Sequence, residues 1–138
     1  MTHQNPAGTA LRTDDAPLTP RYFSQGVRKG PVLQISGQGA LDHATGEVLH
    51  RDSVTEQTTR ALENVNAILA AGGASVADVV MLRVYLTSRE DYGAMNEAYE
   101  RFVDQHLGEG PKPCRTTVFV DLPLDGMLVE IDAQAVVD

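Results

Sequence analysis

Two segments whose apolar residues recur with helical spacing lie on either side of one almost continuous apolar stretch, and this order favours a layered α+β fold. In the first segment, apolar and small residues recur at steps of three and four and share one helix face: Val54, Thr58, Ala61, Leu62, Val65, Ile68 and Leu69. Asp52 or Ser53 can cap the start of this helix, and Gly72 and Gly73 end it. The stretch Val79–Leu86 is typical of a central strand because it is almost entirely β-prone.

The second helical segment opens at residues 88–91, where the sequence resembles a capping box. Its expected buried face carries Tyr92, Met95, Tyr99, Phe102 and Val103. Further short strands are predicted at residues 32–35, 38–41, 117–122 and 127–137. A turn at residues 123–126 joins the last two, so the predicted order is β-β-α-β-α-β-β.

The last predicted strand alternates between an apolar and a mostly polar face. The apolar face carries Met127, Val129, Ile131, Ala133 and Ala135. We therefore expect a mixed sheet with both helices on one face, while small and polar groups occupy the other face. A sheet with one uncovered face usually buries it against another copy of the chain, so an oligomer is expected.

Length and charge restrict the class of protein further. The 138 residues fit one domain, and we expect a disordered extension over residues 1–19 followed by a single domain over residues 20–138. No apolar run approaches the roughly 20 residues of a membrane span. The N-terminus also lacks the pattern of a signal peptide, so we expect a cytoplasmic protein with no membrane partner. The net charge of −8 makes nucleic acid an improbable partner.

Arg115 and Glu130 stand out in the predicted sheet. Arg115 begins a strand, and Glu130 lies in the last strand between apolar residues. If these strands pair through the turn at residues 123–126, the two side chains come near each other. The guanidinium fork suits a small carboxylate, and the carboxyl group can exchange a proton with water. A purely structural salt bridge explains the pair at least as well.

Gly37, Asn96 and Cys114 are further candidates, each with a plainer explanation. A glycine at a strand break lets a ligand reach the backbone, although a bulge explains Gly37 equally well. A semi-buried Asn96 must find partners, in a loop, in the helix or on a ligand. Cys114, the only cysteine, lies beside Arg115 and could be activated, but a buried inert thiol is the alternative. His43 and His50 flank one turn without an evident third ligand, so no metal site is expected.

At these residues the sequence resembles the Rid/YjgF family over residues 22–137. The matching pieces follow the family's order: residues 23–26, 36–38 and 42–46, Gln57 and Asn64, residues 72–75, 78–80 and 84–87, Asn96, Glu97 and Tyr99, and residues 113–118, 122–123 and 129–131. Each piece alone is weak, but so many ordered matches make the resemblance specific.

The resemblance implies a chorismate-mutase-like fold, with a mixed sheet of about six strands and two helices on one face, assembled as a homotrimer with clefts between subunits. It implies that Arg115 binds the substrate carboxylate, that Glu130 is the acid near the attacking water, and that the backbone of Gly37 meets the ligand. It places Asn96 in the site lining and lets Thr117 assist Glu130. The implied reaction converts 2-aminoacrylate and related imines of amino-acid metabolism to 2-keto acids and ammonia, a form of metabolite damage control without cofactor or metal.

Some residues depart from the family pattern. Phe23 stands where an aromatic residue with a hydroxyl group is common at the site entrance, and Tyr22 precedes it. Thr117 stands where many members have Cys, and Cys114 replaces a small residue that holds substrate through its backbone. The alternatives that stay open are a pathway-specific deaminase of the 2-aminomuconate type, a non-catalytic binder of small acids or chaperone-like regulator, and a ribonuclease.

Overall fold

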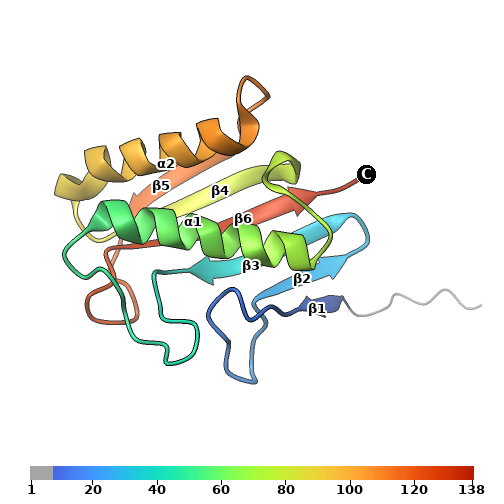
Figure 1. The fold of residues 1–138 in the computed structure, drawn as a ribbon, viewed down its shortest axis with the longest axis horizontal. Coiled ribbons are helices and arrows are strands. Elements are labelled where there is room, and N and C mark those ends of the chain that lie inside the picture. Colours follow the sequence, from blue (N-terminus) through green and yellow to red (C-terminus); the bar gives the residue numbers. More distant parts are fainter. Residues whose placement is uncertain (1–7) are drawn as a thin grey trace, which may run out of the picture.

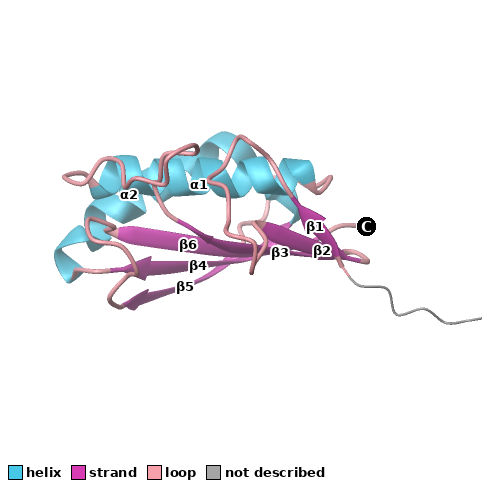
Figure 2. Cartoon of the chain, turned by 90° about the horizontal axis from the view of Figure 1, so that it is seen from below, coloured by secondary structure: helices cyan, strands magenta, loops and turns pink. Residues whose placement is uncertain are grey.

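The computed structural model describes residues 8–138 as a six-stranded mixed sheet that carries two helices on one face. The strands are β1 (Thr9–Leu11), β2 (Gly26–Lys29), β3 (Val32–Gln38), β4 (Val79–Leu86), β5 (Cys114–Phe119) and β6 (Val129–Val136). The helices are α1 (Val54–Ala71) and α2 (Tyr92–Leu107), with 3-10 turns η1 (Val76–Asp78) and η2 (Arg89–Asp91). Figure 1 shows both helices crossing the sheet, and Figure 2 shows that they lie on the same side of it. The expected α+β architecture is confirmed.

The strands are arranged in the order β1-β2-β3-β6-β4-β5. β6 is central and antiparallel to both β3 and β4, whereas β5 is parallel to β4 at the edge of the sheet. The expected hairpin between the last two strands is therefore wrong, because β4 lies between them. β4 is suited to that inner position, since Leu82, Val84 and Leu86 are almost completely buried on the helix side.

The helix ends follow local sequence signals. The hydroxyl group of Ser53 accepts a hydrogen bond from the backbone N–H of Glu56 at 3.1 Å, which caps α1 as expected. Gly73 follows the helix with a φ of 80°, a conformation that glycine adopts without strain. The start expected for the second helix forms η2 instead, and α2 begins at Tyr92.

The segment before β2 is ordered from residue 8, so the expected disorder is wrong for residues 8–19; residues 1–7 lie outside the described part. β1 pairs with β2, and Leu11 and Ala16 are buried. The buried amide of Gln25 holds this segment, donating to the backbone oxygens of Thr13 (3.0 Å) and Pro17 (2.9 Å) and accepting from the Thr13 N–H at 2.8 Å. The side chain of Gln25 thus orders a segment whose own composition predicts disorder.

The strand expected at residues 38–41 is also absent as a separate element. β3 continues through Gln38, and its pairing with β6 shifts register between Ile35 and Gln38. The bulge explanation for Gly37 is thus confirmed, because the glycine lies within this irregularity. Among residues 8–138, no helix is long and apolar enough to cross a membrane.

Candidate active site

Arg115 lies on the edge strand β5 beneath the start of α2. It pairs with the buried Leu82 of β4, so its side chain is on the helix-bearing face. The guanidinium donates a hydrogen bond to the Tyr92 hydroxyl group at 3.3 Å, and its Cζ atom lies 4.8 Å from the centre of the Tyr99 ring. The ion pairs formed by the described residues do not include Arg115. Its charge is therefore available to an anionic ligand.

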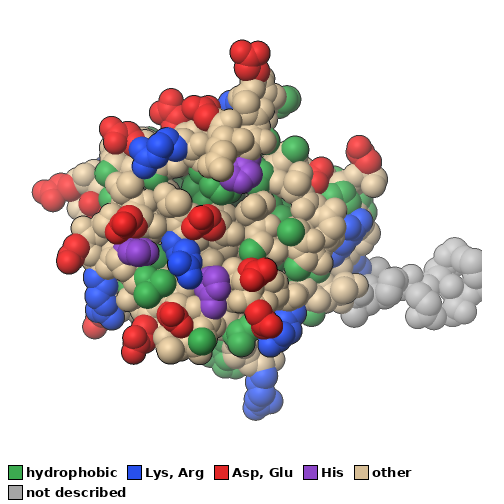
Figure 3. Space-filling model, viewed as in Figure 1, with side chains coloured by type: hydrophobic (Ala, Val, Ile, Leu, Met, Phe, Trp, Pro, Cys, Tyr) green, Lys and Arg blue, Asp and Glu red, His purple; other side chains and the backbone are tan. Residues whose placement is uncertain are grey.

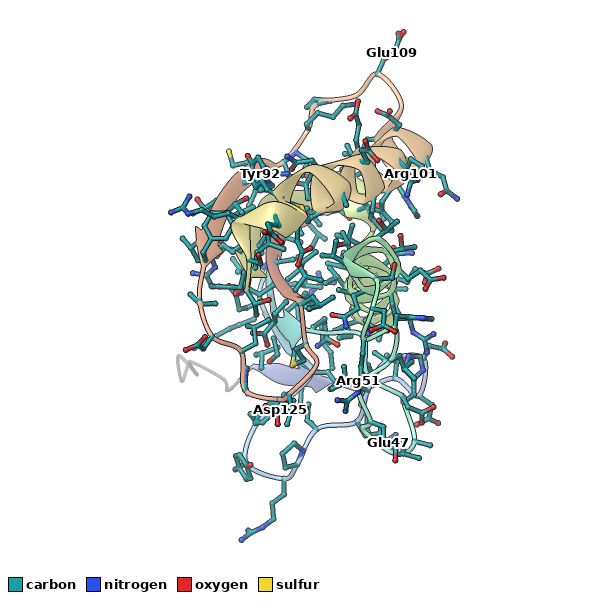
Figure 4. The ribbon with its side chains drawn as sticks, turned by 90° about the vertical axis from the view of Figure 1, so that its left-hand side faces the viewer. Glu47, Arg51, Tyr92, Arg101, Glu109 and Asp125 are labelled. Atoms are coloured by element: carbon teal, nitrogen blue, oxygen red, sulfur yellow. The ribbon has the colours of Figure 1, made fainter. Side chains whose placement is uncertain are left out.

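A surface hollow of about 510 Å³ opens beside this guanidinium; we call it the Arg115 pocket, and it is lined by Arg89, Tyr92, Arg115, Thr117 and Phe119. A second hollow of about 560 Å³ also includes Arg115 and has Asn96 and Tyr99 in its wall. Figure 4 shows Tyr92 on the side of α2 that overlies β5. The structure thus brings three of the expected site residues together: Arg115, Thr117 and Asn96.

Two of these residues carry buried polar atoms without a partner. Thr117 Oγ1 and Asn96 Oδ1 are buried, and neither has a hydrogen-bond partner among residues 8–138. Buried polar atoms normally find partners, because an unsatisfied one costs about 1–3 kcal/mol. Groups left in this state beside a free guanidinium are suited to receive a ligand or a water molecule.

Glu130 and Gly37 form a second group, on the opposite face of the sheet. A Cβ atom on Gly37 would lie only 2.5 Å from Glu130 Oε1, so the missing side chain leaves room for the carboxyl group. Burial, with a smaller contribution from Asp132, raises the pKa of Glu130. A carboxyl group with a raised pKa is protonated at higher pH than usual, which suits a group that exchanges protons with water.

The structure contradicts the expected proximity of Arg115 and Glu130 within one chain. Through β4, Arg115 aligns with Ala133 of β6, three residues from Glu130. Strand spacing puts their Cα atoms roughly 14 Å apart. Because alternate residues of a strand point to opposite faces, the two side chains also lie on different sides of the sheet. One chain alone therefore does not join the guanidinium to the carboxyl group.

Phe23 and Cys114 lie apart from the Arg115 pocket in the single chain. Phe23 is half exposed in the segment before β2, where its ring packs edge-on against Tyr22. β2 and β5 lie toward opposite edges of the sheet (Figure 1). Cys114 precedes Arg115 but points to the other face, and its side chain is exposed, so the expectation of a buried thiol is wrong. Position 114 is a strand edge that nothing in the described chain covers.

Sequence reasoning missed two features of this region. Arg89 lines the Arg115 pocket from η2, and no local motif marks it because the contact joins segments far apart in the chain. On the uncovered face, the nearly buried Asp132 accepts hydrogen bonds from Arg83 Nε at 2.8 Å and from the Tyr85 hydroxyl group at 3.0 Å. Strand alternation could have placed these three on one face, but not their pairing across β4 and β6.

The described residues contain no group of three or more His, Cys, Asp or Glu side chains arranged to hold a metal ion. His43 contacts Asn64 Oδ1 at 3.1 Å, and His50 pairs with Glu56 at 3.2 Å. Each histidine thus has a separate structural partner.

Comparison with known proteins identifies the family. A family model described as endoribonuclease L-PSP matches residues 13–137. The chain belongs to the Rid/YjgF family. One relative is a RutC family protein of Pyrococcus horikoshii, 41% identical over 89% of this chain and 93% of the relative. Another Rid/YjgF relative is named 2-iminobutanoate/2-iminopropanoate deaminase, from Salmonella typhimurium, and is 36% identical over 91% of this chain and 95% of its own.

Solved structures agree with this assignment. The crystal structure of Escherichia coli TdcF with bound serine is similar, with a TM-score of 0.85 and 34% sequence identity. The similarity covers 94% of this chain and 99% of TdcF. The Rid/YjgF fold and a relationship to deaminases are therefore shown for this chain.

Proposed function

We propose that this chain is a cytoplasmic homotrimeric deaminase that hydrolyses imines and enamines of the 2-aminoacrylate type to 2-keto acids and ammonia. The observation that carries the proposal is the guanidinium of Arg115, which no described carboxylate neutralises and which borders a pocket with the unpartnered hydroxyl group of Thr117. The names of the deaminase relatives support the reaction class.

The proposed reaction needs only substrate and water. Arg115 holds the substrate carboxylate by two parallel hydrogen bonds, which orients the adjacent C=N carbon. A water molecule adds its oxygen to that carbon, the C–N bond breaks, and the nitrogen leaves as ammonia while a C=O bond forms. Thr117 and the backbone at Gly37 and residue 114 position the reactants. Glu130 accepts a proton from the water and returns one to the leaving nitrogen.

Separation of Arg115 and Glu130 on opposite sheet faces supports the oligomer. A site that uses both groups needs Arg115 from one copy and Glu130 with Gly37 from another. The sheet face that carries no helix is available for such an assembly (Figure 2). We therefore propose that each active site lies where two subunits of the trimer meet, with Phe23 and Asn96 at its margin.

Turnover of an imine tests the proposal. An amino-acid oxidase acting on alanine generates 2-iminopropanoate, whose disappearance is followed with and without the protein. We expect the native chain to accelerate the decay of the imine. The rate enhancement should fall by about 100-fold or more in Arg115→Ala, because the substitution removes a bidentate charged contact with the substrate. Arg101→Ala is the matched control, since Arg101 lies on another side of α2 (Figure 4).

Other outcomes identify the other candidate functions. Binding of 2-ketobutyrate without any change in the decay of the imine would contradict catalysis and support a binder. RNA degradation that persists in Arg115→Ala would support the activity in the family description. The helix-bearing face does not favour RNA, because acidic side chains are scattered over it among isolated basic ones (Figure 3).

A further inference from the structure

A second guanidinium borders the Arg115 pocket. Arg89 reaches it from η2, and its Cζ atom lies 4.6 Å from the centre of the Phe119 ring. Like Arg115, Arg89 forms no ion pair with any carboxylate of residues 8–138. Two cations without acidic partners thus converge on one hollow, in a chain whose net charge is −8.

Aromatic rings separate the two cations. The Phe119 ring, beside Arg89, lies 6.3 Å from the Tyr92 ring, and the Arg115 Cζ atom lies 5.9 Å from the Tyr92 ring centre. The order across the pocket is therefore guanidinium, ring, ring, guanidinium. Such a surface fits a flat carbon chain with an anionic group at each end, because the rings contact the chain and each fork binds a carboxylate.

A three-carbon substrate with one carboxylate engages only part of this lining. The hollow of about 510 Å³ is open to solvent and extends from Arg115 to Arg89 and Phe119. Arg115 alone satisfies the only carboxylate of such a molecule. Arg89 and the space beside Phe119 then remain without a ligand group.

We propose that Arg89 is a specificity-determining residue that binds a second carboxylate of the substrate, so that the preferred substrates are imines or enamines of dicarboxylic amino acids. The proposal rests on the proposed function for the placement of the first carboxylate on Arg115. The chemistry is the same hydrolysis, in which the C=N bond is replaced by C=O and ammonia leaves. The distal carboxylate is unchanged by the reaction and serves only for recognition.

Binding of two keto acids tests the proposal independently of turnover. Calorimetric titration of the native protein with 2-ketoglutarate and with 2-ketobutyrate gives the ratio of their dissociation constants. We expect 2-ketoglutarate to bind about tenfold more tightly than 2-ketobutyrate or better, because its second carboxylate gains a charge-assisted hydrogen bond from Arg89. In Arg89→Gln the ratio should fall to about one, and Arg89→Lys should retain part of the preference because it keeps the charge without the fork.

Arg101→Gln is the matched control, because it removes the same charge from an exposed position outside the Arg115 pocket. Its dissociation-constant ratio should equal the native one. Equal affinities of the native protein for both acids, or an unchanged ratio in Arg89→Gln, would overturn the proposal.

The imine assay separates this proposal from the proposed function. Rapid 2-iminopropanoate decay that depends on Arg115, together with an unchanged ratio in Arg89→Gln, overturns the role of Arg89 and leaves the deaminase intact. An Arg89-dependent preference for 2-ketoglutarate without any imine turnover would support dicarboxylate recognition while contradicting the deaminase.

Discussion

At the scale of single residues, Glu130 is a site residue whose ionised side chain destabilises the folded protein. Its carboxyl group is half buried against the bare backbone of Gly37, and burial raises its pKa. A carboxyl group with a raised folded-state pKa is stabilised in its protonated form. The stability it contributes is present below the unfolded pKa and is lost as pH rises through the folded pKa.

Replacement of Glu130 by Gln should therefore stabilise the protein at neutral pH. At pH 7 the variant avoids the ionisation of a partly buried group, so we expect its Tm to rise by a few degrees. As the pH falls below the usual range of a carboxyl group, Glu130 becomes protonated in both the folded and the unfolded state, so the two melting temperatures should converge. Thermal melts at equal protein concentration across this pH range measure the difference. A lower Tm of the variant at pH 7 would contradict the effect that we assign to burial. The same variant should also lose deaminase activity.

Individual site residues were predicted unevenly by the sequence. The roles of Thr117 and Asn96 near Arg115 were anticipated only through the family resemblance, since the residue pattern alone did not group them with the arginine. Arg89 was not, because its approach depends on how η2 packs over β5. Proximity of Arg115 to Glu130 was wrong because it rested on a hairpin that the sheet does not contain.

At the scale of elements, Gln57 of α1 fastens two loops to the helix. Its buried amide donates to the backbone oxygens of Leu49 at 3.1 Å and Gly126 at 2.9 Å, and it accepts from the Leu128 N–H at 2.8 Å. The second loop leads directly into β6, which carries Glu130. The helix thus determines where the last strand begins.

Replacement of Gln57 by Leu should destabilise the fold, because it leaves buried backbone groups without partners. We expect the free energy of unfolding to fall by about 2–4 kcal/mol, since each unsatisfied buried group costs about 1–3 kcal/mol. Urea denaturation measures this change. The control is Gln105→Leu, the same substitution at an exposed position of α2, which should stay within about 0.5 kcal/mol of the native protein. Equal stability of the two variants would refute the role of Gln57.

Local elements were predicted well, and long-range pairing was not. The limits of α1 follow from spacing and from the Ser53 cap, both of which act within a few residues. The short strand β2 was missed because its Gly-Val-Arg-Lys sequence has little apolar alternation. The place of β4 between β5 and β6 depends on contacts between segments separated by a whole helix, which periodicity does not encode.

At the scale of the whole molecule, the sheet face without helices carries Glu130, the backbone of Gly37 and a charged cluster. Asp132, Arg83 and Tyr85 are joined there by hydrogen bonds, while Val32, Val118 and Val136 are exposed. A surface that mixes apolar side chains with hydrogen-bonded charged ones is typical of a contact between subunits. Packing of this face against the edge strand β5 of a neighbour would bring one subunit's Glu130 toward the neighbour's Arg115.

Subunit mixing tests the shared site directly. Arg115→Ala and Glu130→Gln chains should each be inactive as homotrimers, whereas co-expressed chains should regain activity. In a random mixture, a site is intact when its Arg115 comes from a Glu130→Gln chain and its Glu130 comes from an Arg115→Ala chain. Each condition holds for half of the sites, so we expect about a quarter of the native activity per site. Activity of differently tagged, co-purified trimers is the measurement. Persistent inactivity of the mixed trimers would contradict a site built from two subunits.

The contact between Gly37 and Glu130 also has a consequence for how the sequence can drift. Any side chain at position 37 displaces the carboxyl group of Glu130. A larger residue at position 37 therefore requires Glu130 to move or to be replaced. An alignment of relatives should show a larger residue at 37 solely in lineages that have given up the acid at 130, and frequent independent substitution would show that the two are not coupled.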